Sequence, residues 1–456
     1  MREALTGQSL RSYCNAMSSP ASLAVILAAG LGTRMKSSRP KALHPIAGRP
    51  MLRHLIDACA AVFDRIVVVG GPDMPDMEQA AAPHPMVTQH ERLGTAHAAL
   101  QAAAWFGDGD VAVLYADNPL ISPATLDRLL ARRRAGAGLA LLAMRPPDPG
   151  RYGRVIAQGE AVERIVEWAD ATEAERAGDL CNAGVLCASG PDMAAWLAAV
   201  RPDNARGEYY LSDIVALARR GGRSVAAVEA PFDELRGINS RAELAAAEAV
   251  VQGRLRLAAM EAGVTMTAPE TVFLAADTML AQDVSIGPNV VFGPGVTVAE
   301  GAEIRAFSHL EGCSVGPHAV IGPYARLRPG TVVEARAHVG NFVELKATRL
   351  GEGAKANHLS YLGDSDIGAG SNIGAGAITC NYDGFAKHRT VIGAGVFVGS
   401  NSVLVAPVQL GDGAFTAAGS VITEDVAADA MAFGRARQAQ LPGAAARFRA
   451  ARRKGS

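Results

Sequence analysis

The chain has 456 residues and a formal net charge of −1, because 44 lysines and arginines nearly balance 45 acidic residues. A chain of this length predicts two or three domains. The near-neutral charge creates no global field toward nucleic acid or an anionic membrane, so no nucleic-acid partner is expected. No apolar stretch is long enough to span a bilayer, so no membrane insertion is expected either.

Both ends of the chain are predicted to lie outside the folded domains. Residues 1–20 lack the apolar core of a secretory signal, so we expect a disordered N-terminal extension in which Met17 is an alternative start. The basic C-terminal tail, residues 441–456, is interpreted as a solvated end, with phosphate binding as the alternative. The 6 cysteines are scattered without a C-x-x-C pair, which favours reduced thiols over a disulfide framework or a zinc site.

Residues 21–240 alternate between short apolar runs and segments with helical spacing. The predicted strands lie in LAVILAAG, RIVVVGG and DVAVLYADNPL, and the predicted helices in MLRHLIDACAAV and GTAHAALQAAAWF. This alternation predicts a mainly parallel sheet with helices on both faces. Ligands of such sheets bind beyond the carboxyl ends of the strands, where LAAGLGTRM (27–35) and YADNPL (115–120) both lie.

Residues 241–265 are predicted to form a linker helix, with a serine and a glutamate near its start in a capping arrangement. Residues 266–440 then change to a period of six. Aliphatic or aromatic anchors recur at Ile286, Phe292, Val298, Ile304, Leu310, Val315, Ile321, Leu327, Val333, Val339, Leu345, Ile367, Ile373, Ile392, Val398, Leu404 and Leu410. A fixed hexad period predicts a parallel β-helix, whose flat outer faces favour a cyclic oligomer with sites between subunits.

The stretch LAAGLGTRM does not match two common phosphate-binding motifs. A dinucleotide fingerprint would need a glycine where Met35 stands, and a P-loop would need a Gly-Lys-Ser/Thr sequence. What remains is a tight turn with exposed amide groups beside Arg34, followed by Lys41. Two cations near free amides suit a triphosphate, whereas the alternative is a glycine turn bordered by surface cations.

A second candidate site lies where the hexad rhythm falters. His358 occurs in KANHLSYLGD, and the non-repeating stretch ITCNYDGFAKHRT supplies Asn381, Tyr382 and Lys387. A histidine among polar groups suits removal of a proton from an amine that attacks a thioester, although the alternative is an ordinary histidine on a coil. Arg328, Lys346 and Lys387 would converge on a monophosphate if the coils stack them, or would otherwise be solvated charges.

The combination LAAGLGTRM…SSRPKALHPIAGRPM closely resembles the signature of nucleotide-sugar pyrophosphorylases. From about residue 22 to 440 the chain resembles the bacterial family that joins N-acetylglucosamine-1-phosphate uridylyltransferase to glucosamine-1-phosphate N-acetyltransferase. The resemblance implies an α/β Rossmann-like nucleotidyltransferase domain followed by a left-handed parallel β-helix of hexapeptide repeats, assembled as a cytoplasmic homotrimer. It also implies Mg²⁺ as cofactor, UTP and acetyl-CoA as co-substrates, and UDP-N-acetylglucosamine for cell-wall synthesis as product.

For residues 21–240, the resemblance implies a uridylyltransferase site. Its UTP and UDP-sugar contacts fall on Ala28, Ala29, Gly30, Gly32, Thr33, Gln89, Gly94, Thr95, Tyr115, Gly153, Glu167, Asn182 and Asn239. Its catalytic cations fall on Arg34 and Lys41, and its metal ligands on Asp117 and Asn239. The chain departs from the family pattern at Leu31, where lysine is common, and at Asn118, where an apolar residue is common.

For residues 266–440, the resemblance implies an acetyltransferase site with His358 as the catalytic base. Its sugar-phosphate contacts fall on Arg328, Lys346, Tyr361, Asn372 and Lys387, and its acetyl-CoA contacts on Ala375, Asn381, Tyr382, Ser400, Ala418 and Arg435. Glucosamine-1-phosphate would be acetylated first, and N-acetylglucosamine-1-phosphate would then receive UMP from UTP with release of pyrophosphate. Two alternatives stay open: a single-activity nucleotidyltransferase with a regulatory or oligomerising β-helix, and a non-catalytic scaffold.

Overall fold

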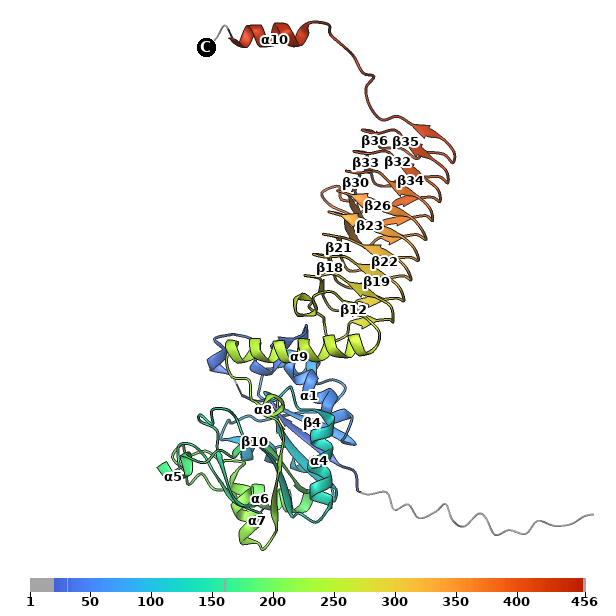
Figure 1. Cartoon of the computed structure of the whole chain (residues 1–456). Coiled ribbons are helices and arrows are strands. Elements are labelled where there is room, and N and C mark those ends of the chain that lie inside the picture. The colour runs from blue at the N-terminus through green and yellow to red at the C-terminus, as the bar shows by residue number, and fades with distance from the viewer. Residues whose placement is uncertain (1–19, 31, 160, 454–456) are drawn as a thin grey trace, which may run out of the picture. The chain divides into compact units, whose positions relative to one another are not determined.

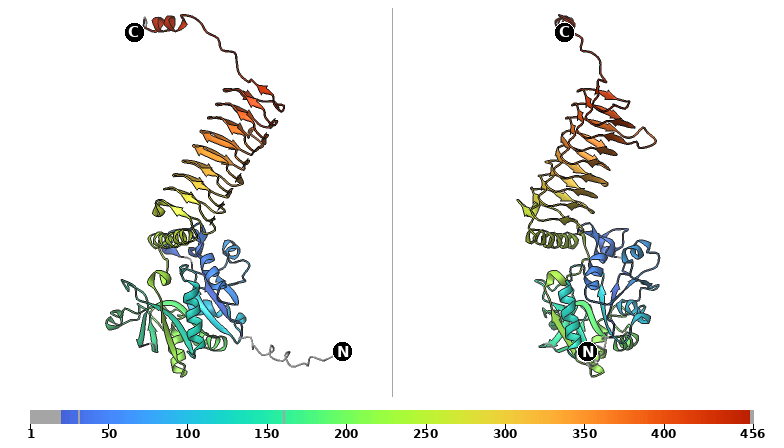
Figure 2. Two further views of the ribbon diagram at one scale, coloured as in Figure 1. Left: turned by 45° about the vertical axis from the view of Figure 1, so that its right-hand side comes forward. Right: turned by 90° about the vertical axis from the view of Figure 1, so that its right-hand side faces the viewer.

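The computed structural model describes residues 20–30, 32–159 and 161–453 and divides the chain into two compact units, Met1–Val251 and Gln252–Ser456 (Figures 1 and 2). The predicted N-terminal extension up to residue 19, the departure at Leu31 and the last three residues of the basic tail lie outside the described residues. Within the described part of the chain, no helix is both long and apolar enough to cross a membrane.

The N-terminal unit is built on one nine-stranded sheet. Its strand order is β5 (Met86–Thr88), β4 (Arg65–Gly70), β1 (Leu23–Leu27), β6 (Asp110–Tyr115), β10 (Cys181–Ser189), β7 (Leu139–Met144), β11 (Val225–Glu229), β9 (Ala161–Val166) and β8 (Arg154–Gln158). β1 is parallel to both β4 and β6, whereas β10 runs antiparallel between β6 and β7. The predicted parallel pairing is confirmed for β5, β4, β1 and β6 and for β7 with β11. The sheet as a whole is mixed, because β10 and β9 run antiparallel to both of their neighbours.

Helices cover both faces of this sheet, as predicted. One face carries α1 (Met51–Ala60), α2 (Pro75–Ala81) and α4 (Pro123–Arg134), and the other carries α3 (Thr95–Leu100), α6 (Gly190–Ala199) and α7 (Asp213–Arg220). Strand side chains alternate between the two cores, so that in β1 Ile26 packs with the first set and Val25 with the second. Because both faces are buried, the strands read as continuous apolar runs.

Shorter elements connect these layers. They are η1 (Thr33–Met35), η2 (Lys41–Leu43), β2 (Pro45–Ile46), β3 (Arg49–Pro50), η3 (Ala103–Trp105), α5 (Glu173–Arg176) and α8 (Phe232–Leu235). The predicted linker helix is α9 (Arg241–Glu261), which continues across the boundary between the two units. Its predicted serine cap is present, since Ser240 Oγ accepts a hydrogen bond of 3.2 Å from Glu243 N.

The C-terminal unit contains three parallel sheets that run along a solenoid (Figure 2). The first sheet contains β12 (Thr265–Met266), β14 (Ser285–Ile286), β17 (Glu303–Ile304), β20 (Val320–Ile321), β23 (His338–Asn341), β26 (Lys355–His358), β29 (Asn372–Ile373), β32 (Phe397–Val398), β35 (Phe415–Thr416) and β37 (Met431–Ala432). The second contains β13 (Met279–Leu280), β16 (Thr297–Val298), β19 (Cys313–Val315), β22 (Thr331–Val333), β25 (Arg349–Leu350), β28 (Ser365–Ile367), β31 (Thr390–Ile392) and β34 (Val408–Leu410). The third contains β15 (Val291–Phe292), β18 (His309–Leu310), β21 (Arg326–Leu327), β24 (Glu344–Lys346), β27 (Tyr361–Gly363), β30 (Ile378–Cys380), β33 (Val403–Val405) and β36 (Val421–Ile422).

The hexad anchors form the single core of this solenoid. Every predicted anchor from Ile286 to Leu410 is at most 3 % exposed and belongs to one apolar cluster. Each coil therefore buries one anchor per strand, which confirms the hexapeptide β-helix. Beyond the last coil, part of the basic tail forms the helix α10 (Ala444–Arg453), in which no residue is buried.

Two neighbouring valines of β22 provide a matched test of the inward and outward faces. Val333 is 1 % exposed and Val332 is 41 % exposed. We expect Val333→Ala to lower the free energy of unfolding of the β-helix by about 2 kcal/mol, because two buried carbons are lost and a cavity is left. Val332→Ala, the control, should change it by less than about 0.5 kcal/mol. Urea denaturation followed by circular dichroism measures both, and equal effects would contradict the assigned faces.

Candidate active sites

A cavity of about 360 Å³ lies in the N-terminal unit at the carboxyl ends of β1 and β6. The predicted site residues that line it are Ala28, Ala29, Gly30, Arg34, Lys41, Gln89, Gly94, Thr95, Tyr115, Asp117 and Asn239. The structure thus brings together most of the residues that the nucleotide site was predicted to contain, from segments more than 200 positions apart.

The glycine turn shapes one wall of this cavity. Gly32 has a φ of +63°, and a Cβ there would lie 2.5 Å from Lys41 Cβ. Only glycine therefore permits both the left-handed turn and the close approach of the lysine. Gly32 does not line the cavity itself, but it allows Lys41 to stand beside the turn that carries Arg34.

Four polar side chains meet at the end of the cavity next to this turn. Lys41 Nζ donates to the Asp117 carboxylate and, at 3.0 Å, to Asn239 Oδ1. Arg34 Nη2 donates to the same Asn239 oxygen at 2.7 Å. The Asp117 and Asn239 oxygens thus face one shared cation, and a carboxylate with an amide oxygen is a donor set that Mg²⁺ accepts. Among the described residues no three His, Cys, Asp or Glu side chains gather as a metal site, so substrate phosphates would have to complete the coordination.

Hydrogen bonds to the backbone hold Asp117 and Asn239 in place. Ile238 N donates to Asp117 O at 2.9 Å, and Asn239 N donates to Glu243 Oε2 at 2.6 Å. Asn118, the departure from the family pattern, is buried and donates its Nδ2 to Leu235 O at 2.6 Å. Its amide therefore fastens the segment that leads to Asn239 against the segment that carries Asp117.

The predicted uracil contacts also line the cavity. Gln89 is buried, and its Nε2 lies 3.1 Å from both Gly94 O and His97 Nδ1. Gly94 has a φ of +132°, and a Cβ there would meet Tyr209 O at 2.5 Å, so this position also requires glycine. The predicted contact Thr95 is held by a 2.9 Å hydrogen bond from Leu211 N to its Oγ1.

The predicted sugar contacts form a separate group. Asn182 N donates to Gly153 O at 2.8 Å, and a Cβ at Gly153 would lie 3.1 Å from Glu167 Oε2. Glu167 accepts a hydrogen bond of 2.9 Å from Ser212 Oγ, and burial raises the pKa of its carboxyl group. Together with Thr33, Glu167 lines a second hollow rather than the nucleotide cavity.

Two residues near the nucleotide site were not found from the sequence. Arg92 lines the cavity, and its Nε donates to Ala29 O at 2.8 Å, which ties the LGTAH segment to the glycine turn. Ser212 holds Glu167 as described. The only signal for Arg92 is a cation two positions before Gly94, and a lone serine carries no signal.

In the C-terminal unit, His358 ends β26 and pairs in register with Asn341 of β23. Its Nδ1 lies 2.7 Å from Asn341 Oδ1. An amide oxygen accepts a hydrogen bond, so this contact keeps the proton on Nδ1 and leaves Nε2 with its lone pair. The pair is exposed, so the basic nitrogen is accessible to a substrate.

The predicted phosphate contacts gather on the third sheet and the segment that follows it. Lys346 Nζ lies 2.7 Å from Asp364 Oδ1, and Asn381 Nδ2 lies 2.5 Å from Asp364 Oδ2. The nearby Lys346 ammonium lowers the pKa of the Lys387 amine. A Cβ at Gly363 would lie 2.5 Å from the Tyr361 hydroxyl, which places that hydroxyl beside the same group.

Arg328 stands at the border of this group, where its Nη1 donates to Glu344 Oε1 at 2.9 Å. The non-repeating stretch forms a small hairpin, closed by a bridge between Tyr382 and Lys387. Within the hairpin, Asp383 Oδ1 accepts hydrogen bonds from two following amides at 2.8 and 2.7 Å. The interruption of the hexad rhythm therefore marks an ordered insertion that delivers Lys387 to the group.

Four of the predicted acetyl-CoA contacts, Ala375, Ser400, Ala418 and Arg435, lie along one corner of the solenoid, one coil after another. Gly376 N donates to His358 O at 3.2 Å, Asn401 N to Ala375 O at 2.7 Å, and Gly419 N to Ser400 O at 2.8 Å. The sequence neighbours Ala375, Ser400 and Ala418 thus follow His358 up this corner, with a rise of about 4.8 Å per coil. A Cβ at Gly419 would lie 3.7 Å from Arg435 Cδ, which extends the row.

Two predicted contacts do not join these groups in the described chain. Asn372 lies on the first sheet in register with Lys355 and Phe397, and Tyr382 is 61 % exposed with its hydroxyl on Gly384 O. No hydrogen bond among the described residues links either side chain to His358. Asn341 and Asp364 were not found from the sequence, because only the stacking of coils brings them to His358 and Lys346.

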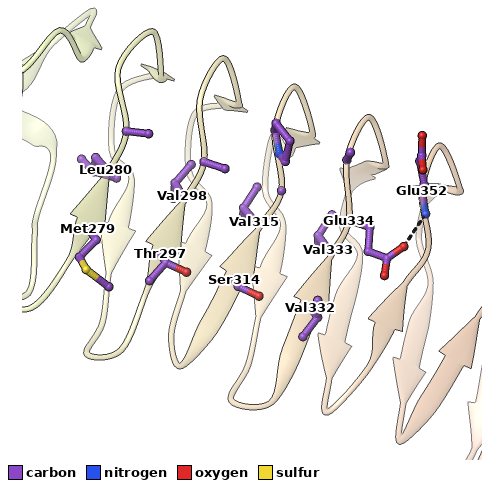
Figure 3. A pocket seen from close by; sticks show the side chains of 15 residues that line it. Met279, Leu280, Thr297, Val298, Ser314, Val315, Val332, Val333, Glu334 and Glu352 are labelled. Carbon is purple, nitrogen blue, oxygen red and sulfur yellow. Dashed lines mark hydrogen bonds between the residues drawn. The ribbon is translucent and has the colours of Figure 1, made fainter.

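Another hollow of the solenoid, on the second sheet, has a volume of about 790 Å³ (Figure 3). Outward residues Met279, Thr297, Ser314 and Val332 form its floor, and Glu334 accepts a hydrogen bond of 3.0 Å from Glu352 N. It contains none of the predicted site residues, so size alone does not mark the chemistry here.

Comparisons with known proteins agree with this arrangement. Residues 24–183 match the family described as MobA-like NTP transferase domain, and residues 389–424 match the bacterial transferase hexapeptide family with six repeats. "Bifunctional protein GlmU" of Gluconacetobacter diazotrophicus is 69% identical over 436 residues, covering 94% of this chain and 95% of that protein. Proteins of the same name from Granulibacter bethesdensis (68% identical; 95% and 97% covered) and Acidiphilium cryptum (67% identical; 93% and 98% covered) are similarly close.

The chain belongs to the GlmU family. The resemblance to the bifunctional family is therefore confirmed, and the chain is an enzyme with a uridylyltransferase and an acetyltransferase activity. UTP and acetyl-CoA follow as substrates of a GlmU protein. Membership of a bifunctional family disagrees with both alternatives, the single-activity enzyme and the non-catalytic scaffold.

One carboxyl group near the sugar contacts predicts a pH dependence of stability. Burial, together with the charges of Glu167 and Asp170, raises the pKa of Asp213 to about 6. Since the unfolded value is about 3.9, the folded chain holds more protons between these values, and stability falls as the pH rises through 6. We expect Asp213→Asn to raise the melting temperature at pH 7.5 but to give a smaller gain at pH 4.5.

Differential scanning fluorimetry at the two pH values measures this difference. Asp203→Asn, a change of an exposed carboxylate in the preceding segment, is the control. A gain from Asp213→Asn that is larger at pH 4.5 than at pH 7.5 would contradict the raised pKa.

Proposed function

We propose that the chain acetylates glucosamine-1-phosphate with acetyl-CoA in the C-terminal unit and then transfers UMP from UTP to N-acetylglucosamine-1-phosphate in the N-terminal unit. The observation that carries this proposal is the meeting of Arg34, Lys41, Asp117 and Asn239 at the glycine turn. The pair of His358 and Asn341 supports the second activity. We assign both reactions to the cytoplasm, as the resemblance implies.

In the uridylyl transfer, an oxygen of the sugar phosphate attacks the α-phosphorus of UTP. The bond between that phosphorus and the bridging oxygen breaks, and pyrophosphate leaves. Gln89 would bind the uracil edge, because an amide both donates and accepts hydrogen bonds. Gly153, Glu167 and Asn182 would bind the sugar hydroxyl groups, with Glu167 held by Ser212.

Asp117 and Asn239 would hold Mg²⁺ through the oxygens that now face Lys41. Bound there, the ion would neutralise charge that develops on the phosphates. Lys41 would then turn from these oxygens to the phosphates, joined by Arg34. Positioned cations of this kind are typically worth about 10²–10³ in turnover.

In the acetyl transfer, the amine of glucosamine-1-phosphate attacks the thioester carbon of acetyl-CoA. His358 Nε2 would take the proton from the amine as the C–N bond forms, and the thiolate of CoA would leave. Asn341 holds the imidazole in the required tautomer. Arg328, Lys346, Tyr361 and Lys387 would bind the phosphate, and the corner row from Ala375 to Arg435 would bind acetyl-CoA.

We also propose that the chain acts as a homotrimer with acetyl-transfer sites between subunits. Phe307, Tyr324 and Phe342 stack in a row on the corner that leads to His358, with ring centroids 4.9 and 5.2 Å apart. They are 50, 47 and 55 % exposed, and the exposed Leu359 continues the row. Such an aromatic edge, continuous with the catalytic corner, suits contact with a second copy.

The two activities should separate by mutation. Asp117→Ala should lower the uridylyltransferase turnover by at least about 10²-fold, because a ligand of the proposed ion is lost, and should leave acetyl transfer unchanged. His358→Ala should lower acetyl transfer by about 10²–10⁴-fold and leave uridylyl transfer unchanged. Both reactions are measured separately by release of pyrophosphate and of CoA thiol.

Matched controls are the exposed Asp108→Ala and His309→Ala, which should keep both activities. Loss of both activities to the same extent from either Asp117→Ala or His358→Ala would contradict two separate sites.

The trimer is tested at the centre of the aromatic row. Tyr324 has a φ of +55°, a conformation that aspartate tolerates, so Tyr324→Asp should fold but carry a charge into the proposed interface. We expect sedimentation velocity to show a shift from trimer to monomer, with loss of acetyl transfer and retention of uridylyl transfer. Phe433→Asp, at an exposed aromatic outside the row, is the control. An unchanged trimer in Tyr324→Asp would remove this row from the interface.

A further inference from the structure

A second hollow of about 770 Å³ lies beside the nucleotide cavity in the N-terminal unit. Its described lining residues are Thr33, Arg34, Arg151, Glu167, Trp168, Ala169, Arg176, Arg206 and Tyr210. Arg34 lines both spaces, so the hollow adjoins the nucleotide cavity at this side chain. The uridylyl transfer proposed above accounts for Arg34 and Glu167, but it leaves the other three arginines without a role.

The charge of this lining is strongly positive. It contains four arginines and a single carboxylate, and that carboxylate, Glu167, is already bonded to Ser212. Arg151 and Arg206 are exposed and have no ion pair within the part of the chain that the structure describes. Asp170, which does not line the hollow, accepts a hydrogen bond of 2.9 Å from Ala205 N. Arg34 and Arg176 bond to an amide and a carbonyl oxygen, not to a carboxylate. Guanidinium groups without a carboxylate partner suit a phosphate ligand.

A buried arginine holds two of these side chains in position. Arg154 is 2 % exposed, and its guanidinium donates to the carbonyl oxygens of Gly150 and Arg176, both at 3.1 Å, and to that of Tyr152. Burying a cation without a carboxylate partner costs free energy. The hydrogen bonds of Arg154 to several carbonyl groups offset this cost and hold those carbonyls together. The carbonyls of Gly150 and Tyr152 flank Arg151, and the third carbonyl belongs to Arg176. Arg154 therefore fixes the backbone from which the two arginine side chains reach the hollow.

Trp168 also contacts these arginines. The guanidinium groups of Arg154 and Arg176 lie 5.1 and 4.8 Å from its ring centroid, and Arg176 Nη2 donates to Trp168 O at 3.1 Å. The arginine side of the hollow is therefore organised before any ligand binds, which reduces the entropic cost of binding.

We propose that Arg151 and Arg206, with Arg34 and Arg176, form a second phosphate-binding site next to the nucleotide cavity. This inference rests on the proposed uridylyl transfer, in which two reactants carry the required anion: the incoming sugar 1-phosphate and the departing pyrophosphate. The site raises the local concentration of one of them beside Arg34, where the reacting phosphates meet.

The test uses the full-length protein with Arg151→Gln and Arg206→Gln combined, a change that removes charge without introducing an acid. The Michaelis constants for UTP and N-acetylglucosamine-1-phosphate are measured in the forward direction, and that for pyrophosphate in the reverse direction. We expect the constant for one phosphate reactant to rise about tenfold, as loss of a charged hydrogen bond predicts, while that for UTP changes by less than about twofold. The matched control is Arg201→Gln, an exposed arginine of the same segment outside the hollow.

The two sources of the anion give different results. A rise confined to N-acetylglucosamine-1-phosphate assigns the site to the incoming sugar, and a rise confined to pyrophosphate assigns it to the leaving group. In either case the effect should shrink at high salt, because exposed charges are screened. Unchanged constants for both reactants would overturn the site.

Calorimetry separates this inference from the proposed function. Inorganic pyrophosphate and N-acetylglucosamine-1-phosphate are each titrated into the parent protein and the double variant. Weaker binding of either anion to the double variant supports the site even if the parent shows no uridylyl transfer, a result that would contradict only the proposed function. Equal binding of both anions to the two proteins overturns the site whatever the activity.

Discussion

The contact of the Lys41 ammonium group with Asp117 and Asn239 is the interaction on which the nucleotide site depends. It joins residues that are 76 and 198 positions apart, one after the glycine turn, one at the end of β6 and one just before α9. A carboxylate and an amide oxygen that lie side by side in a cavity are both hydrogen-bond acceptors, so a cation between them satisfies both. The same oxygens can accept either the lysine or a metal ion, so the lysine is held next to the phosphates that it would meet.

Neutral amides position the charged groups at both sites. Asn118 fastens the segment before Asn239 to the segment of Asp117, and Asn341 sets the tautomer of His358. An amide offers both a donor and an acceptor without adding charge, so it orients a neighbour with little effect on the local field. Arg154 has a related role through carbonyl groups, because it organises backbone rather than a ligand.

The β-helix converts sequence spacing into spatial rows. Each coil lies on the previous one through parallel backbone pairs, so residues about one coil apart become neighbours on the outer surface. The aromatic row, the His358 corner and the cationic group are all products of this stacking. Candidate site residues lie where the repeat is interrupted. The hairpin after β30 brings Lys387 to Lys346, while the hexad anchors stay buried.

The sequence by itself determined the two architectures and most residues of the nucleotide site, because hexad anchors, apolar runs and the glycine turn are local patterns with local physical causes. It also placed His358 and Lys387 at an interruption of the repeat. Only the tertiary structure decided that Asn341, Asp364, Arg92 and Ser212 support these sites, and that Arg151, Arg176 and Arg206 surround one hollow. Such residues carry no periodic signal, since their partners become neighbours only when strands, coils and loops distant in the chain are packed together.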